Sequence, residues 1–427
     1  MTVGILGGGI SGISLAAQLG GDVEVLEKRA RIGGLCGSIV DGGFTFDAAG
    51  PHIMFSKNKD VLNLMVAALG DNVQQRRRDN KIWFKGRLVK YPFENDLASL
   101  PKEDTFECIY GYIANKHAND TPSNLAEWSY KTFGEGISDK YFIPYNRKIW
   151  NYDPAKLGLD FVARIPKPPM EDVLKSAIGI STEGYLHQLY YYYPVEGGYE
   201  SIVHAFAKRV RGRITPSYTV ANIARDGNRW VVNDERKYDV LVSTIPVHEL
   251  LSVWPDAPQK AREAAARLRY NSLINVLVGC NHDPGHAYTA VYVPEPAILF
   301  HRISFPQSFS PKNVPPGGSA VMAEITANEG DGVWEMSDDH ILERTISDLV
   351  NIGFVDPQTI VYKRVVRFPY GYPVYDLDYR RNVTILRESI EAAGVHLLGR
   401  FAQFDYINSD VCVERALSLA ERMNDHR

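Results

Sequence analysis

The sequence predicts an α/β chain made of a domain assembled from separated stretches, an antiparallel β-sheet domain and a helical insertion. Three observations predict this arrangement: a strand, glycine turn, helix and strand at the N-terminus, strand-like alternation between roughly residues 270 and 370, and helical spacing between roughly residues 100 and 185. With 427 residues, the chain is long enough for two or three domains.

The first forty residues carry the most specific pattern. The apolar run Val3–Leu6 leads directly into Gly7-Gly8-Gly9-Ile10-Ser11-Gly12, which fits G-x-G-x-x-G. A helix-compatible segment and a second strand at 22–26 follow, and that strand ends in Glu27, 20 residues after the first glycine. This order is typical of a Rossmann-like dinucleotide-binding unit, in which the acid binds a ribose.

Each glycine of this turn has a physical task. Gly7 permits the tight turn, Gly9 lets backbone N–H groups approach a pyrophosphate, and Gly12 lets the helix pack closely against the strand. A further pair, Gly33-Gly34, resembles the extended fingerprint of FAD proteins more than that of NAD dehydrogenases. For both glycine motifs, a merely structural turn is the alternative interpretation.

The composition is that of an ordinary globular enzyme. The chain has 47 basic and 51 acidic residues, which give a formal net charge of −4, and 45% of its residues are hydrophobic. The basic clusters at 76–78 and 208–213 are short, so we interpret them as solvated surface and expect no nucleic-acid partner. No apolar run approaches the length of a membrane helix, and we expect a cytoplasmic protein without a signal peptide.

Cysteine and histidine spacing predicts neither a disulfide framework nor a metal site. The four cysteines are far apart and include no C-x-x-C pair, which fits free thiols in a reducing compartment. They are Cys36, Cys108, Cys280 and Cys412. His282 and His286 are four residues apart, but the intervening Pro284-Gly285 prevents a helix that would place both on one face.

The first half of the chain alternates between sheet and helix patterns. Residues 43–47 predict a strand and Lys59–Leu69 predict a helix. Residues 81–84 and 87–90 flank a Lys-Gly turn and predict a hairpin. Helical segments separated by proline-bearing loops then extend from roughly residue 100 to 185.

The second half predicts mainly strands. A strand at 190–194 precedes a helix at 199–210, a hairpin spans 219–232, and residues 238–244 form a buried strand that returns to the nucleotide sheet. The alternating strands that follow are predicted at 273–278, 297–305, 320–326 and 360–368, and are expected to cover the cofactor. One helix capped at Ser337 interrupts them, and a strand at 395–400 and a helix from Asp410 end the chain.

These elements predict three domains. The discontinuous Rossmann-like FAD-binding domain comprises residues 1–78, 190–245 and 388–427. A helical substrate or lid domain comprises residues 95–185, and the antiparallel sheet domain comprises residues 79–94 and 246–387.

With these elements in order, the chain resembles the flavin-dependent UDP-galactopyranose mutases, which are relatives of the amine oxidase and protoporphyrinogen oxidase flavoproteins. The resemblance covers nearly the full length. The matching segments are Gly50-Pro51-His52-Ile53 with Phe55, Tyr91–Asn95, Pro144-Tyr145-Asn146 with Trp150, Arg164, Arg302, Gly371-Tyr372-Pro373, and Gly399–Tyr406. Each segment is a weak signal alone, but together, in order and at suitable spacing, they are fairly specific.

The resemblance implies roles for particular residues. The residues expected to be catalytic are Arg164, Arg302 and His52. The residues expected to bind substrate are Phe93, Asn146, Trp150, Arg164, Arg302, Tyr372 and Tyr406. The residues expected to bind the cofactor are Gly7, Gly9, Ile10, Ser11, Gly12, Glu27, Lys28, Gly34, Leu35, His52, Ile53, Val220, Gly399, Arg400, Tyr406, Asn408 and Asp410.

The resemblance also implies a reaction, the interconversion of pyranose and furanose forms of a nucleotide sugar without net redox change. In the family, N5 of reduced FAD forms an adduct with the anomeric carbon, UDP leaves, and the sugar ring opens and recloses through its 4-hydroxyl. Such chemistry needs cations for a departing diphosphate, and guanidinium groups bind phosphate through bidentate hydrogen bonds. The resemblance implies that NADPH or NADH reduces the flavin and that the protein acts in cell-surface polysaccharide biosynthesis. A homodimer is one possible oligomeric state.

Departures from the family pattern leave the nucleotide sugar open. Phe309 stands seven residues after Arg302, where many members have a tyrosine whose hydroxyl would touch the diphosphate. Near the C-terminus, Phe404, Tyr406 and Asn408 stand where bacterial members carry an aromatic pair and an acid. The expected substrate is therefore a UDP-sugar, such as UDP-galactose or its N-acetyl analogue, or a dTDP-sugar such as dTDP-fucose.

Other functions remain open on the residues themselves. An amine oxidase or desaturase would consume oxygen and would have an apolar pocket or an aromatic cage in place of converging arginines. A non-catalytic binding module would lose the flavin-facing loop around His52. Alternatively, Arg164 and Arg302 are ordinary exposed surface residues, and Trp150 is a buried residue of the protein core.

Overall fold

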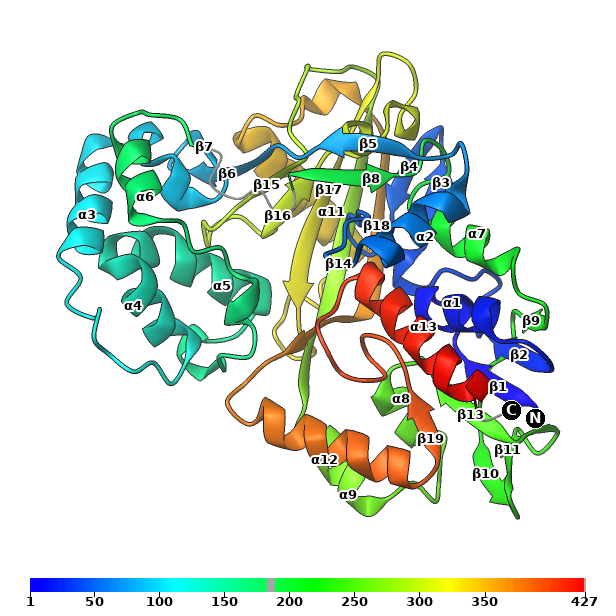
Figure 1. Cartoon of the computed structure of the whole chain (residues 1–427). Helices are drawn as coiled ribbons and strands as arrows, with labels where there is room; N and C mark the ends of the chain where they lie inside the picture. The colour runs from blue at the N-terminus through cyan, green and yellow to red at the C-terminus, as the bar shows by residue number, and fades with distance from the viewer. Residues whose placement is uncertain (183–188, 426–427) are drawn as a thin grey trace.

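The protein is described from a computed structural model, which covers residues 1–182 and 189–425. Figure 1 shows an α/β part that contains both chain ends, a sheet in the centre, and a group of helices from residues 102–177 that projects on the far side. The first strand, Val3–Leu6, and the last helix, Ser409–Asp425, lie next to each other in this view, although they stand at opposite ends of the sequence.

A parallel sheet with strand order β19-β13-β1-β2-β9 forms the centre of the α/β part. Its strands are β1 (Val3–Leu6), β2 (Val23–Leu26), β9 (Arg213–Thr215), β13 (Val240–Ser243) and β19 (Val395–Leu397). The predicted strand at 238–244 therefore does return to this sheet, where Val240 of β13 pairs with Val3 of β1. Three distant stretches of the chain build one sheet, which confirms the predicted discontinuity.

Helices cover both faces of this sheet because alternate strand residues point to opposite sides. Val3 and Ile5 contact one group of helices, whereas Leu6 contacts the other. The first group is α1 (Ile10–Gln18), α2 (Lys59–Leu69), α7 (Glu200–Ala207) and α13 (Ser409–Asp425). The second group is α8 (Val247–Ser252), α9 (Gln259–Ala265) and α12 (Tyr379–Ala392). The predicted α/β fold class is confirmed.

Short antiparallel ribbons surround this domain. The predicted hairpin at 219–232 forms, but its first strand begins four residues later than expected, at Ile223. The ribbon strands are β3 (Ser38–Asp41) with β4 (Phe44–Asp47), β5 (Gln74–Arg77) with β8 (Tyr190–Tyr193), and β10 (Ile223–Asp226), β11 (Arg229–Val232) and β12 (Arg236–Tyr238). The displaced start of β10 leaves residues 219 and 220 outside the ladder and free to line a cavity.

The central sheet has the strand order β18-β14-β17-β16-β15-β6-β7. Its strands are β6 (Asn80–Phe84), β7 (Arg87–Lys90), β14 (Arg269–Cys280), β15 (Ala290–Tyr292), β16 (Arg302–Ser304), β17 (Ser319–Ala327) and β18 (Ile360–Val374). Most neighbours are antiparallel as predicted, but β15 and β6 pair in parallel, so the sheet is mixed.

The predicted strand at 297–305 is wrong for most of its length. Only Arg302–Ser304 forms β16, and the short strand Ala290–Tyr292 was not predicted. Pro294 and Pro296 lie between the two strands, and since proline cannot donate to a ladder, the chain turns there. The helix capped at Ser337 is confirmed as α11 (Asp338–Asn351), where the Ser337 hydroxyl accepts a hydrogen bond from the backbone of His340 at 3.3 Å.

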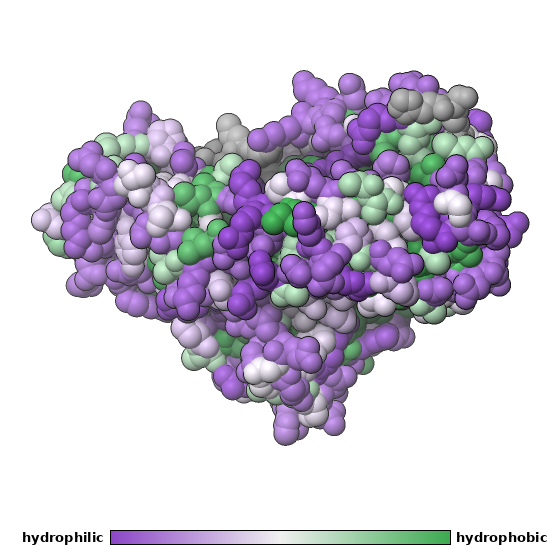
Figure 2. Space-filling model, turned by 90° about the horizontal axis from the view of Figure 1, so that it is seen from below, coloured by the Kyte–Doolittle hydropathy of each residue, from purple (hydrophilic) through white to green (hydrophobic). Residues whose placement is uncertain are grey.

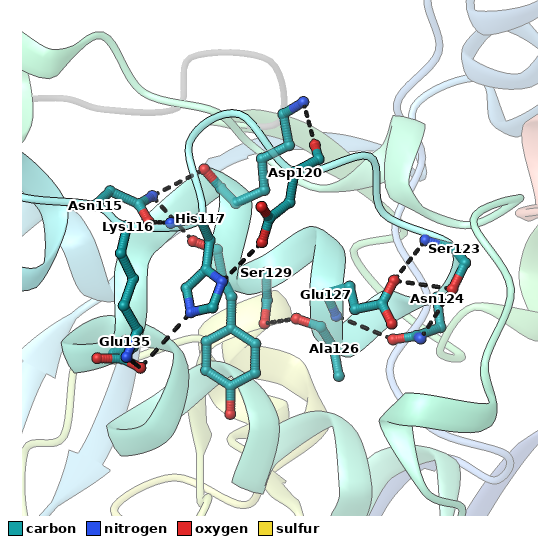
Figure 3. A network of polar contacts seen from close by, with 12 residues as sticks. Asn115, Lys116, His117, Asp120, Ser123, Asn124, Ala126, Glu127, Ser129 and Glu135 are labelled. Atoms are coloured by element: carbon teal, nitrogen blue, oxygen red, sulfur yellow. Dashed lines mark hydrogen bonds and ion pairs between the residues drawn. The ribbon is translucent and has the colours of Figure 1, made fainter.

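The helical part is confirmed as predicted, although residues 183–188 of the expected stretch lie outside the described residues. Its helices are α3 (Lys102–Ile113), α4 (Leu125–Ile137), α5 (Ile143–Trp150) and α6 (Met170–Ala177), with a π-helical turn at Ser138–Phe142. Figure 3 shows a polar network within the loop that follows α3 and between this loop and α4. In this network Asn124 caps α4 by accepting from the Glu127 backbone at 3.0 Å, while Glu127 accepts from the Ser123 backbone at 2.7 Å.

One face of the protein is mainly hydrophilic (Figure 2), and the cysteines are buried and unpaired in the described residues. Figure 2 shows that hydrophilic side chains cover most of one face, with hydrophobic side chains in small separate groups. Within residues 1–182 and 189–425, no helix has both the length and the apolar character that crossing a bilayer requires. The cysteines are buried and form no disulfide in this part of the chain, which also contains no group of three metal-ligating side chains.

Candidate active site

Two adjoining cavities lie between the α/β part, the central sheet and the helical part. The glycine-loop cavity, of about 370 Å³, is lined by the N-terminal glycine turn and by Glu27. The arginine cavity, of about 280 Å³, is lined by Arg164 and Arg302. His52, Arg400 and Ser409 line both cavities and so form the wall between them.

The glycine turn has the geometry that the motif predicts. Gly9 is the N-cap of α1, so the first N–H groups of the helix have no intrahelical partner and lie at the cavity. Gly12 packs so close to β1 that an added Cβ would collide with the carbonyl oxygen of Gly7. The turn therefore offers backbone donors to an anion, as a dinucleotide pyrophosphate requires.

The second glycine pair packs directly on the first. Gly33 donates from its backbone N–H to the carbonyl of Gly8 at 2.9 Å, and a Cβ on Gly34 would lie 3.1 Å from the Cα of Gly9. Both segments line the same cavity, and Gly34 also has a φ of 59°. The pair therefore packs on the glycine turn and lines the same cavity, so it is not an isolated surface turn.

Glu27 holds the position expected of a ribose-binding acid. Its carboxylate is buried and accepts hydrogen bonds from the backbone of Gly8 at 2.7 Å and of Arg29 at 2.8 Å. These contacts fix the carboxylate beside the glycine turn, at the edge of the cavity. Lys28, also at this edge, forms an ion pair of 2.8 Å with Glu249.

The other predicted cofactor residues divide into three groups. Those that line the glycine-loop cavity are Gly7, Gly9, Ile10, Ser11, Glu27, Lys28, Gly34, Leu35, His52, Val220 and Arg400. Those that line the arginine cavity instead are Ile53, Tyr406 and Asn408. The remaining three, Gly12, Gly399 and Asp410, line neither cavity. Gly12 packs against the backbone of Gly7, Gly399 packs against Ser11, and Asp410 is buried in the first turn of α13.

Arg302 lines the arginine cavity and is held by Glu324. Arg302 and Glu324 face each other across β16 and β17, and the guanidinium contacts both carboxylate oxygens, at 2.9 and 2.7 Å. The hydroxyl of Tyr372 donates to the same carboxylate at 2.6 Å. Glu324 was not predicted as a site residue, although a single acid within the apolar strand Ser319–Ala327 is an unusual feature that could have indicated it.

Electrostatics keep this buried pair ionised. Burial alone would raise the pKa of Glu324, but the charge of Arg302 and hydrogen bonds from His301 and Tyr372 outweigh burial and hold the pKa well below its ordinary value. Burial also opposes the charge of Arg302, yet Glu324 raises the pKa of the guanidinium. Arg302 is therefore a fixed cation with a fixed orientation.

Arg164 reaches the same cavity from the helical part. It ends the short 3-10 helix Val162–Arg164, and its guanidinium lies 4.6 Å from the centre of the Tyr406 ring. It donates hydrogen bonds to the Tyr406 carbonyl and, at 3.2 Å, to the side chain of Asn408. Arg164 thus connects the helical part to the C-terminal segment at the edge of the cavity.

Aromatic residues complete the wall near Arg164. The Trp150 indole donates to the side chain of Asn146 at 3.1 Å, and its ring meets the rings of Tyr372 and Tyr406 edge to face. The predicted substrate residues Asn146, Trp150, Arg164, Arg302, Tyr372 and Tyr406 all line the arginine cavity. Sequence positions far apart therefore converge as expected.

Phe93 and Phe309 do not fit the prediction. Phe93 is fully buried and does not line the cavity, because it stacks on Tyr141 with 5.0 Å between ring centres. Phe309 packs in the core against Tyr191 and Tyr193, away from the cavity lining. The missing hydroxyl at Phe309 therefore does not alter the arginine cavity.

His52 is uncharged at neutral pH. Burial, and then the positive charge of Arg400, lower the pKa of His52 to about 4. Its Nε2 lies 2.9 Å from the Leu35 carbonyl, so Nε2 carries the proton and donates it there. A neutral imidazole therefore stands in the wall between the cavities.

Five further residues line the arginine cavity and were not among the predicted site residues, although three of them lie in segments that resemble the family. They are Arg78, Tyr91, Glu94, Tyr145 and Tyr292. Arg78 was expected on the solvated surface, but it follows β5, and the pairing of β5 with β8 directs this strand to the cavity. No local sequence signal distinguishes it from its neighbours Arg76 and Arg77.

Comparisons with known proteins bear on the family and the fold of this chain. Residues 10–384 match the model of a family described as flavin containing amine oxidoreductase. The dTDP-fucopyranose mutase of Escherichia coli is 27% identical over 174 residues, which cover 38% of this chain and 45% of that protein. The match thus spans less than half the length of this relative.

Solved structures show a similar fold along the whole chain. A reduced UDP-galactopyranose mutase has a TM-score of 0.89 at 23% identity, covering 100% of this chain and 96% of the other. A putrescine oxidase bound to putrescine has a TM-score of 0.71 at 14% identity, covering 99% of each chain. At these identities the likeness establishes the fold.

Proposed function

The chain belongs to the flavin containing amine oxidoreductase family, and from that premise we propose that it is a flavin-dependent mutase of nucleotide sugars. Its substrate is UDP-galactopyranose or a close analogue such as a dTDP-sugar, and its product the corresponding furanose. The names of the mutase relatives and the guanidinium groups around the arginine cavity support this proposal.

The observation that carries the proposal is the contact between a dinucleotide site and a cationic cavity. Arg78, Arg164, Arg302 and Arg400 all line the arginine cavity, and His52 and Arg400 also line the glycine-loop cavity. FAD bound to the glycine turn would reach this shared wall with its ring system. A sugar whose diphosphate binds the arginines would then lie against the ring.

The residues present fit FAD and a diphosphate leaving group. The glycine turn offers backbone N–H groups to the pyrophosphate of FAD, and Glu27 lies where it can accept from a ribose hydroxyl. When bound in its reduced form, FAD supplies a nucleophile for the anomeric carbon without net redox change. Arg302 and Arg164 stabilise the departing diphosphate, and Tyr372 and Tyr406 orient the sugar.

The helical part has the role of a lid in this proposal. Arg164 is exposed and connects residues 162–164 to the 406–408 segment by hydrogen bonds. Opening these contacts would admit the substrate, and the diphosphate would hold Arg164 in the closed position afterwards. The division into a FAD-binding domain, a helical lid and a sheet domain is part of the same proposal.

Isomerisation under two redox conditions tests the proposal. The purified protein should show the absorbance of bound flavin, and after anaerobic reduction with dithionite it should convert UDP-galactose or dTDP-fucose into the furanose form. The oxidised protein should show no conversion. The proposal is wrong if neither nucleotide sugar is isomerised in the reduced state while an amine supports steady oxygen uptake.

An FAD-dependent amine oxidase is the second candidate, and one observation favours it. The rings of Tyr91, Tyr145 and Tyr292 cluster in the arginine cavity with 4.9 and 5.3 Å between centres, and aromatic rings attract ammonium cations. However, the arginine side chains in the same cavity would repel such a cation. The mutase proposal therefore explains more of the cavity.

A further inference from the structure

Glu94 is a buried carboxylic acid that the proposed reaction does not use. It lies in the short 3-10 helix Phe93–Asn95, lines the arginine cavity and is only 4% exposed. The Ser176 hydroxyl fixes this segment by donating to the Glu94 carbonyl at 2.8 Å. Within residues 1–182 and 189–425, no side chain donates a hydrogen bond to the Glu94 carboxyl group.

The surroundings of Glu94 suit a flat, apolar ring. Phe133, Tyr141 and Phe142 line the same cavity and come from the helical part, and Tyr141 lies close enough to Glu94 for the two groups to interact electrostatically. Arg302 and Arg400 come instead from the central sheet and the C-terminal segment. The cavity thus joins an aromatic region with one carboxyl group to a cationic region, as a nucleotide diphosphate requires.

Burial keeps the Glu94 carboxyl largely neutral below pH 7 and about half neutral at pH 7. Burial raises its pKa to about 7, and its own backbone N–H offsets only part of this effect. The nearby titratable groups are the phenols Tyr112 and Tyr141, whose pKa values burial raises, so both are uncharged.

The charged side chains on the elements packed against Glu94 do not neutralise it. On α6, Lys175 forms an ion pair with Glu171 at 2.5 Å. On β7, Arg87 donates to the carbonyl of Ser99 at 3.3 Å, and Lys90 donates to the carbonyl of Thr182. The remaining charged group on α6, Asp172, is an anion, which would disfavour ionisation of Glu94 further.

We propose that Glu94 recognises the base of the nucleotide sugar and selects uracil or thymine. As a neutral acid, its carbonyl oxygen accepts from the N3–H of the base and its hydroxyl donates to the C4 carbonyl. This inference rests on the proposed function, because it assigns the base of that substrate. The aromatic residues around Glu94 contact the faces of the same ring.

The protonation state determines which base fits. The imide edge of uracil or thymine carries one donor between carbonyl acceptors, so an ionised carboxylate would repel one of those carbonyls. Guanine presents adjacent N1–H and N2–H donors, which match an ionised carboxylate instead. A neutral Glu94 therefore favours a pyrimidine nucleotide sugar over a GDP-sugar.

Calorimetric binding to the oxidised, FAD-loaded protein tests this inference, since that form is not expected to turn over. The affinity for UDP-galactose should be constant at low pH and should fall as the pH rises through about 7. Its diphosphate diester does not titrate in this range, so the change reports on the protein. GDP-mannose should bind at least about tenfold more weakly.

Two substitutions separate hydrogen bonding from charge. Glu94→Gln keeps one acceptor and one donor but cannot ionise, so UDP-galactose should bind it with little dependence on pH. Glu94→Ala should lose about tenfold or more in affinity at low pH, because the imide edge is left without partners. Equal affinity of Glu94→Ala and the unaltered protein, or an unchanged pH dependence in Glu94→Gln, would overturn the inference, as would tighter binding of GDP-mannose.

Arg302→Ala distinguishes failure of this inference from failure of the proposed function. This substitution should weaken the binding of UDP-galactose and of GDP-mannose to a similar extent, because both ligands carry a diphosphate. If Arg302→Ala has this effect and the Glu94 variants have none, only the assignment of Glu94 is wrong. If the unaltered protein binds neither nucleotide sugar, both proposals are overturned.

Discussion

Arg302 and Glu324 show how a single residue pair sets the charge of the proposed active site. The guanidinium contacts both carboxylate oxygens, and the carboxylate is also the acceptor for Tyr372. Arg302 keeps 19% of its side chain exposed toward the cavity, whereas Glu324 is 1% exposed. Glu324 therefore acts as a positioning residue that leaves one side of the guanidinium available for a ligand.

Replacing Arg302 tests its proposed contact with the diphosphate. Arg302→Ala should lower the turnover of UDP-galactose by about 10²–10³-fold while flavin absorbance stays unchanged, since Arg302 does not line the glycine-loop cavity. Arg381→Ala is a matched control, because Arg381 is an exposed arginine paired with Asp378 on α12. Turnover equal to that of the control would remove Arg302 from the site.

Replacing Glu324 tests the buried ion pair. Glu324→Gln leaves Arg302 without its counterion and should reduce the free energy of unfolding by about 3 kcal/mol at neutral pH. The pKa of Glu324 lies below its ordinary value of 4.5, so its contribution is complete above that pH and decreases as the pH falls. Urea unfolding should therefore show a smaller acid-induced loss of stability in Glu324→Gln than in the unaltered protein.

The elements with regular local patterns were predictable from sequence, and those defined by long-range pairing were not. The helix Lys59–Leu69 has the predicted bounds because its apolar spacing and its Asn58 cap are local signals. By contrast, β15 and β16 have three residues each and exist through pairing with distant strands. Arg78 reaches the cavity through the same long-range packing, which no local pattern records.

The glycine turn offers a pair of substitutions that separate folding from cofactor binding. Gly12→Ala should destabilise the protein and abolish flavin loading, because its Cβ would collide with the Gly7 carbonyl. Gly9 has an extended backbone with φ −76° and room for a Cβ, so Gly9→Ala should fold but bind FAD more weakly. Thermal unfolding and flavin absorbance measure the two effects, and equal behaviour of both variants would contradict this prediction.

The hydrogen bonds between Arg164 and the 406–408 segment can be tested by hydrogen exchange. Arg164→Ala removes the hydrogen bonds to Tyr406 and Asn408, so residues 159–166 should exchange their amide hydrogens faster in the ligand-free protein. The KM for UDP-galactose should also rise. Unchanged exchange in this segment would show that Arg164 does not hold the lid closed.

The whole molecule is organised by a sheet that needs both ends of the chain. The strands β1, β13 and β19 pair side by side although they begin at residues 3, 240 and 395. The glycine-loop cavity is likewise lined by residues from 7 to 412. A ligand in this cavity would therefore connect stretches that unfolding separates.

Cofactor removal should consequently lower the stability of the entire chain. At a free FAD concentration one hundred times its dissociation constant, binding should stabilise the folded state by about 2.7 kcal/mol, and the thermal midpoint should increase with FAD concentration. Riboflavin, which lacks the adenosine diphosphate that the glycine turn would bind, should leave the midpoint nearly unchanged. An equal effect of riboflavin would contradict binding through the turn.

The wall formed by His52, Arg400 and Ser409 has a consequence for evolution. Among residues 1–182 and 189–425, only this partition lines both chambers, so under the proposed function most residues that would choose a sugar or a base would make no contact with the flavin nucleotide. Mutations there can change substrate preference without weakening cofactor loading, whereas mutations in the partition affect both at once. New specificities would then arise on the lid side, while the partition itself stays nearly invariant among descendants.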